Sequence, residues 1–181
     1  IDKTLTILDN VPESLQKERF NYIILSFLKQ YAYVFKNKKI LKENKSFGDL
    51  SFIAETFQRC YLDSKNTDLF FSKLINKTKA DYSRYIYFYL TYLVENNKIE
   101  KAKAIADKLD YINTTLLLSQ GKSWIENNKL NKFNKVFSCN NHNDVAGEFL
   151  FLISNLYSSQ NKYEKSNFYL SLSNYLNPEF V

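Results

Sequence analysis

The chain has 181 residues, of which 45% are apolar and 24% charged, and its formal net charge is +6. This length allows one sizeable core or a short array of helical repeats. Three glycines and two prolines supply few turn signals, which argues against a β-sandwich or a phosphate-binding α/β fold. No apolar run reaches the ~18 residues of a membrane span, and no signal-peptide pattern is present.

Residues 1–80 carry apolar side chains at helical spacing. Residues 1–11 predict the last turns of a helix, and a longer helix is expected over about 13–37. We expect Asp49 to be the N-cap of the next helix, and Asn66 to begin another. The clearest amphipathic pattern consists of Phe20, Ile23, Ile24, Phe27, Leu28, Tyr31, Val34 and Phe35.

The densest basic cluster lies between two predicted helices and holds one acidic residue, Glu43. Such a run is typical of a solvated loop. A nucleic-acid interface would need a basic stripe with aromatic or arginine platforms, and the chain has only three arginines. Nucleic-acid binding is therefore the weaker alternative. The lysines concerned are Lys36, Lys38, Lys39, Lys42 and Lys45.

Cys60 and Cys139 are the chain's two cysteines, 79 residues apart and without a metal-binding or disulfide-framework spacing. We expect two buried free thiols rather than a disulfide. Two cysteines are compatible with either redox environment, so both a cytoplasmic and an exported location remain open.

A short phrase recurs three times in the second half of the chain. Glu95-Asn96-Asn97-Lys98 is followed 31 residues later by Glu126-Asn127-Asn128-Lys129, and 33 residues after that by Gln160-Asn161-Lys162. Each copy lies between two apolar helical segments, and asparagine tolerates the left-handed backbone that a tight helix-ending turn needs. The expected helix pairs are 81–96 with 98–110, 113–127 with 130–139, and 144–160 with 163–176.

These pairs resemble tetratricopeptide repeats over residues 81–178, most closely in the last copy. Leu150, Ile153, Ser154 and Tyr157 match first-helix positions of the family. Tyr163, Ser166, Leu170, Ser173 and Pro178 match positions after the turn.

The middle copy has Gly121 at the family glycine and Trp124 in place of the tyrosine. Phe133 stands where the family has a small residue, so we expect this hairpin to be splayed or repacked. In the first copy Leu90 replaces the glycine, and Ala102 and Ala106 are the small residues.

The resemblance implies an all-α fold: an α-solenoid of antiparallel helical hairpins forming a right-handed superhelix. Its units would be about 81–112, 113–143 and 144–178, with degenerate helical repeats in 1–80. It also implies a non-enzymatic scaffold that binds a protein or peptide partner on its concave face. We further expect the chain to be a piece of a longer repeat protein. The face residues carried over are Arg84, Tyr87, Thr91, Val94, Thr115, Leu118, Lys122, Ile125, Glu148, Phe151, Asn155 and Ser158.

Catalytic and metal-binding patterns are weak. Cys139 and His142 form half of a zinc-ligand spacing, but their neighbours are poor ligands, and we expect Asp144 to cap a helix instead. No nucleophile triad, phosphate loop or metalloprotease pattern stands out. We therefore expect no enzymatic activity, no cofactor and no metal.

Two segments are unusually aromatic. Residues 82–92 hold six aromatic side chains distributed all round a helix, which predicts either packing between repeats or a tyrosine-rich binding face, with some of them outside the core. The last helix carries aromatics that cannot all face the preceding helix, so we expect an uncovered apolar surface there and end-to-end self-association as an alternative role. These residues are Tyr163, Phe168, Tyr169, Leu172 and Tyr175.

Overall fold

The computed structural model describes residues 1–41, 47–76, 83–111 and 114–179, and this part of the chain is helical, with no strand. The first layer consists of α1 (Asp2–Asp9), α2 (Glu13–Gln16) and α3 (Arg19–Asn37). The expected helix over 13–37 is interrupted at Glu18, whose extended backbone is the N-cap of α3.

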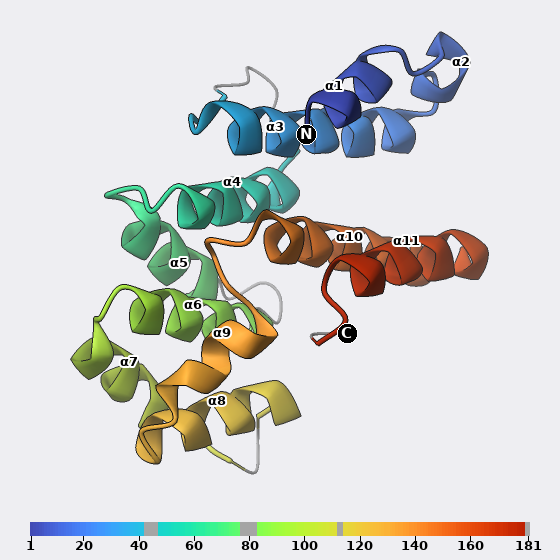
Figure 1. The fold of residues 1–181 in the computed structure, drawn as a ribbon. Coiled ribbons are helices and arrows are strands. Elements are labelled where there is room, and N and C mark those ends of the chain that lie inside the picture. The colour runs from blue at the N-terminus through green and yellow to red at the C-terminus, as the bar shows by residue number, and fades with distance from the viewer. Residues whose placement is uncertain (42–46, 77–82, 112–113, 180–181) are drawn as a thin grey trace.

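The following helices stack in chain order below α3 (Figure 1). Each contacts the next through its apolar side, because no single hairpin can bury that side alone. They are α4 (Asp49–Tyr61), α5 (Thr67–Ile75), α6 (Ser83–Glu95), α7 (Ile99–Ala106) and α8 (Leu116–Glu126). The short α9 (Phe133–Val136) does not continue the order, because it lies back beside α6 rather than below α8 (Figure 1).

The repeated asparagine phrase forms the predicted turn. Asn97, Asn128 and Asn161 have φ of 56°, 54° and 58°, the left-handed conformation. In each turn the next amide closes back on the helix end, as Lys98 N donates to Leu93 O at 2.8 Å and Lys129 N donates to Trp124 O at 2.7 Å. In the same turns Asn97 N donates to Val94 O at 3.1 Å and Asn128 N donates to Ile125 O at 3.2 Å. The two bonds of each turn together form the Schellman arrangement, which satisfies otherwise orphaned carbonyls.

A fourth turn of the same geometry precedes these three. Asp63 has φ of 45°, and Ser64 N donates to Arg59 O at 3.1 Å. Asp63 lies 34 residues before Asn97, so α4 and α5 form a hairpin at the same period. The repeated asparagine phrase does not reveal this hairpin, because Asp63 stands at the turn position where the other copies have asparagine.

The last hairpin does not lie at the end of the stack. α10 (His142–Ser158) and α11 (Tyr163–Leu176) pack closely on each other, and α10 also contacts α4 and α3. Figure 1 shows the pair beside the stack, at the level between α4 and α6. The chain therefore reverses after α9 and returns to the helices with which it began.

Small residues set the close approach of α10 and α11. Ser154 Oγ donates to Ser166 O at 2.9 Å, and Ser173 Oγ donates to Gly147 O at 2.8 Å. A Cβ at Gly147 would lie 3.4 Å from Ser173 O. The small residues Ser166 and Ser173 thus lie in the contact between α10 and α11, as the sequence pattern predicts.

The middle hairpin is repacked around Phe133, as expected. Phe133 is fully buried against Tyr87 and Trp124, with ring centroids 5.6 and 5.3 Å away. It occupies the space that Gly121 leaves, since a Cβ there would lie 3.4 Å from the Phe133 ring. The second helix is short: a 3-10 turn (Leu130–Lys132) leads into α9, which ends before the extended Phe137.

Two predicted caps are wrong. Gly48, not Asp49, is the N-cap of α4. Its φ of 64° is a positive value that favours glycine over other residues. Asn141, not Asp144, is the N-cap of α10, with its side chain accepting from Asn143 N. Asp144 lies inside the helix and accepts a 2.8 Å hydrogen bond from Ser138 N.

Candidate functional site

The twelve residues carried over to a concave face do not form an open surface. Three of them, Thr115, Asn155 and Ser158, are exposed, while Arg84, Val94 and Phe151 are partly buried. The remaining six are buried: Tyr87, Thr91, Leu118, Lys122, Ile125 and Glu148. Their contacts are with neighbouring helices of the chain.

The chain's own α10 covers part of this face. The Phe149 ring lies 5.5 Å from Phe27 and 5.2 Å from Tyr31, both on α3. Phe137, just before α10, lies 4.6 Å from Phe88 on α6 and 6.0 Å from Phe57 on α4. Aromatic contacts of this geometry add to the apolar area buried, so the returning hairpin is part of the core.

Two of the predicted face residues form an ion pair across this contact. Arg84 Nη2 on α6 lies 2.8 Å from Glu148 Oε2 on α10, and the Arg84 guanidinium lies 4.0 Å from the Phe151 ring centroid. Glu148 is 2% exposed. Burial raises the pKa of Glu148, and the nearby Arg84 charge partly offsets that rise.

The ammonium group of Lys122 also makes its contacts within the chain. Its Nζ donates to Leu109 O at 2.7 Å and lies 3.7 Å from Glu126 Oε1. A buried lysine normally needs such partners, because an unpaired ammonium is costly away from water. Lys122 therefore ties α8 to the segment after α7.

The aromatic helix α6 is buried on all its sides. Tyr85, Tyr87, Phe88, Tyr89 and Tyr92 are each at most 6% exposed, and Tyr82 lies outside the described residues. The expectation that some of these rings lie outside the core is wrong for the five described ones. α5, α7, α8 and α9 contact α6 from different directions, which one sequence window does not reveal.

The expectation of two free thiols is wrong, because Cys60 and Cys139 form a disulfide with a Cα–Cα distance of 5.3 Å. Both residues are buried. The bond joins α4 to the segment between α9 and α10, and so connects the stack to the returning hairpin. The spacing of the two cysteines does not indicate this bond, because the contact arises only from the reversal of the chain.

Two further carboxylates, the partly buried Glu95 and the buried Asp144, lie at the same junction. Glu95 accepts a 3.2 Å hydrogen bond from Cys139 N, while its Oε1 atom is buried and has no hydrogen-bond partner among the described residues. Burial raises the pKa of Glu95 and of Asp144, and hydrogen bonds from residues 138–141 partly offset both rises. These side chains hold the 138–141 backbone in its turn.

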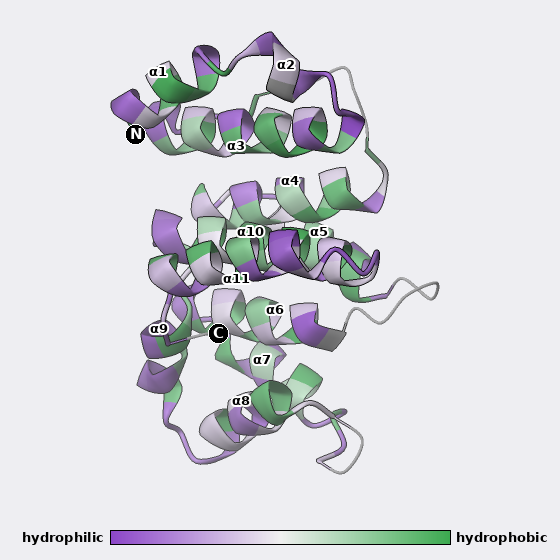
Figure 2. Ribbon diagram, turned by 90° about the vertical axis from the view of Figure 1, so that its right-hand side faces the viewer, coloured by the Kyte–Doolittle hydropathy of each residue, from purple (hydrophilic) through white to green (hydrophobic). Residues whose placement is uncertain are grey.

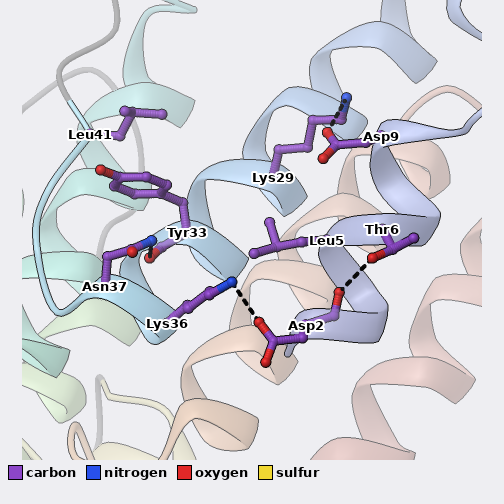
Figure 3. A pocket seen from close by; sticks show the side chains of 9 residues that line it. All are labelled: Asp2, Leu5, Thr6, Asp9, Lys29, Tyr33, Lys36, Asn37 and Leu41. Carbon is purple, nitrogen blue, oxygen red and sulfur yellow. Dashed lines mark hydrogen bonds and ion pairs between the residues drawn. The ribbon is translucent and has the colours of Figure 1, made fainter.

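A cleft lined by both charged and apolar side chains lies between α1 and α3 (Figure 3). Its volume is about 520 Å³, and its lining is mixed. Lys36 lies 2.6 Å from Asp2, and Lys29 lies 3.3 Å from Asp9, so an ion pair crosses the cleft near each end of α1. The Asp2 and Asp9 side chains remain largely exposed, and these pairs dock α1 on α3 rather than present unpaired charge.

The outer side of α11 is the exposed apolar surface expected at the last helix. Phe168, Leu172 and Tyr175 are 59%, 37% and 84% exposed and follow one another at the i, i+4, i+7 spacing of a single helix face. We call these three residues the α11 stripe. Tyr163 is also exposed but lies off this face, whereas Tyr169 is partly buried and stacks on Tyr157 at 5.5 Å.

The α11 stripe lies in an uncharged stretch. Residues 166–178 contain no Lys, Arg, Asp or Glu, although 24% of the chain is charged. Figure 2 looks at the molecule from the side on which α11 lies. Exposed aromatic residues without charged neighbours are the composition of an interface centre rather than of a solvated helix.

Within the described ranges no group of histidine, cysteine, aspartate and glutamate side chains is arranged to hold a metal, and no helix has the length and apolar character of a membrane span. His142 begins α10, and its ring packs on Phe35 with centroids 5.7 Å apart. Comparison of the chain with known families, characterised proteins and solved structures finds no match.

Proposed function

We propose that this chain is a non-enzymatic protein-interaction domain whose contact surface is the α11 stripe. The exposure of Phe168 and Tyr175, at 59% and 84%, carries the proposal. Scattered apolar side chains are normal on a protein surface, but three on one helix face within an uncharged stretch are characteristic of binding sites.

The proposal places binding on the outside of α11 rather than on the inner face of the array. Six of the twelve inner positions are buried, and Arg84 is paired with Glu148. A partner reaching those positions would have to displace α10 and break its aromatic core contacts. The α11 stripe requires no such rearrangement.

We also propose that helices α4 to α9 are tetratricopeptide-like repeats arranged as a short right-handed array. The shared turn geometry at Asp63, Asn97 and Asn128 supports this relationship, as does the close contact at Gly121. In this view α10 and α11 are a repeat-like hairpin that folds back instead of extending the array.

The partner best suited to the α11 stripe is an amphipathic helix. A helix of 14 residues offers a ridge about 21 Å long, which matches a second helix with apolar residues at the same spacing. Aromatic side chains serve well as anchors because they bury a large area at low entropic cost.

A displayed library of amphipathic helical peptides tests the proposal. Peptides selected on the protein should carry an apolar stripe, and their binding should fall at least about tenfold on Tyr175→Asn, as for an interface anchor. The matched control is Asn174→Ser, beside Tyr175 on the same helix. Selection of no binder, or of binders indifferent to Tyr175→Asn, would reject the proposed surface.

A further inference from the structure

We propose that the chain binds an uncharged aromatic small molecule in a pocket between α1, α3, α10 and the end of α11. We call it the α3–α10 pocket. It is separate from the α11 stripe, so the inference goes beyond the proposed function. The size of the pocket, its apolar floor and the chemistry of its rim carry the inference.

The α3–α10 pocket lies where the returning hairpin meets the first layer of helices. Its volume is about 290 Å³. α3 contributes Tyr31 and Phe35 to its lining, and α10 contributes Ala146 and Leu150. The two residues of each helix are four positions apart, so they share one helix face. The pocket therefore exists only because α10 packs beside α3.

Two alanines in the lining leave room for an occupant. Ala32 on α3 is 6% exposed, and Ala146 on α10 is partly buried. Protein interiors are close-packed, and voids larger than a water molecule are few. An apolar cavity of about 150 Å³ suffices for benzene, so the α3–α10 pocket has room for two fused rings. A helix, about 10 Å across, is too wide to enter.

The floor of the α3–α10 pocket is apolar and partly aromatic. Leu8, Tyr31, Phe35 and Leu150 are each at most 7% exposed. The Phe35 ring centroid lies 5.7 Å from that of Tyr31 and 5.7 Å from that of His142, so three lining rings follow one another. Aromatic rings pack favourably on one another in tilted or edge-to-face arrangements. A flat aromatic body therefore fits this floor.

Polar groups lie at the exposed rim. Thr4, His142 and Asn143 line the pocket and are exposed, and each can form a hydrogen bond with a bound molecule. Among the described residues of the lining there is no Asp, Glu, Lys or Arg. A charged group taken into the pocket would thus lose its water without gaining a counter-charge. The lining favours an uncharged ligand with one hydroxyl or N–H group at the rim.

Titration with 2-naphthol, followed by NMR of the isotope-labelled chain, is the first test. We expect saturable binding with a dissociation constant below about 1 mM, and shifted resonances at Ala32 and Ala146. The comparison probe is 2-naphthoate, which has the same rings and carries a carboxylate. It should bind at least about tenfold more weakly, because its charge is unpaired in the pocket. Equal affinity for the two probes would overturn the proposed ligand class.

Variants of the lining test the location. Ala146→Leu fills the pocket, and Thr4→Trp covers it from an exposed rim position that leaves the core intact. Each should weaken 2-naphthol binding at least about tenfold. Ala104→Leu, at an exposed position of α7, is the matched control and should bind as wild type does. The absence of saturable binding, undiminished binding by either variant in its folded state, or loss of binding on Tyr175→Asn would overturn the inference.

Discussion

Arg84 and Glu148 form a buried ion pair between two segments that are 64 residues apart in the chain. The Glu148 side chain is 2% exposed and the Arg84 side chain 29% exposed. The pair lies where the returning α10 meets α6, so it reports directly on that contact. Its two residues belong to the set that the family resemblance placed on an open face.

Removing one partner should cost more than removing both. Arg84→Met should lower the free energy of unfolding by about 3 kcal/mol, because it leaves a buried carboxylate unpaired. Arg84→Met combined with Glu148→Gln should recover much of that loss. Urea denaturation of both single variants and the double variant gives the coupling energy, with Lys103→Met, in an exposed pair with Glu100, as control. Additive effects of the two changes would show that the pair is not coupled.

Gly121 should tolerate no large side chain. A Cβ there would lie 3.3 Å from Tyr87 and 3.4 Å from Phe133, so Gly121→Leu must push α8 away from α6 and α9. We expect a loss of about 1–3 kcal/mol in the free energy of unfolding. The neighbouring exposed Gln120→Leu should stay within about 0.5 kcal/mol. Equal denaturant midpoints for these two variants would contradict the packing described for Gly121.

The buried carboxylates predict an unusual pH response. Burial raises the pKa of Glu95, Asp144 and Glu148, so the folded state binds protons more readily than the unfolded state. Their contribution to stability should therefore increase as the pH falls from about 7 to about 4.5, through the raised pKa values. Glu95→Gln removes one such group. The free energy of unfolding of this variant, relative to that of wild type, should therefore be highest near neutral pH.

Chemical denaturation at several pH values measures this difference. The stability of Glu95→Gln minus that of wild type should decrease on acidification. Glu100→Gln, whose side chain is 89% exposed in wild type, is the matched control. A Glu95→Gln difference that is flat between these pH values would show that Glu95 is not desolvated in the folded state.

The disulfide should contribute substantially to stability. It closes a loop between residues 79 apart, and removal of a native disulfide typically costs about 2–5 kcal/mol. We expect a loss in this range for the double variant Cys60→Ser, Cys139→Ser, measured by thermal or urea unfolding without reductant. Stability equal to that of wild type would mean that the bond is absent in solution.

The parts of the fold predicted from sequence depend on local chemistry. The asparagine turns are an example, because the left-handed backbone at Asn97, Asn128 and Asn161 depends on residues that lie next to each other. The close contacts at Ser166, Ser173 and Gly121 follow likewise from small residues at helical spacing. The exposed α11 stripe was visible because one helix carried more aromatic residues than one neighbour could cover.

The parts that the sequence did not predict depend on the return of α10. Glu148 became buried, and Cys139 reached Cys60, because the chain reverses after α9. Periodicity shows that the last hairpin resembles the others, but it carries no information on which neighbours that hairpin selects. Phe137 and Phe149 make this choice through contacts with rings from the first half of the chain.

The return of α10 and α11 is the central claim, because it buries the inner positions and leaves the α11 stripe outside. Peptide mass spectrometry after digestion without reductant tests it most directly. We predict one linked pair of peptides containing Cys60 and Cys139, and no free thiol in the intact protein. If the last hairpin instead extended the stack, two repeat layers of about 10 Å each would separate the two cysteines, beyond the ~7 Å limit for a disulfide. Two free thiols in protein purified and digested under oxidising conditions would therefore contradict the account.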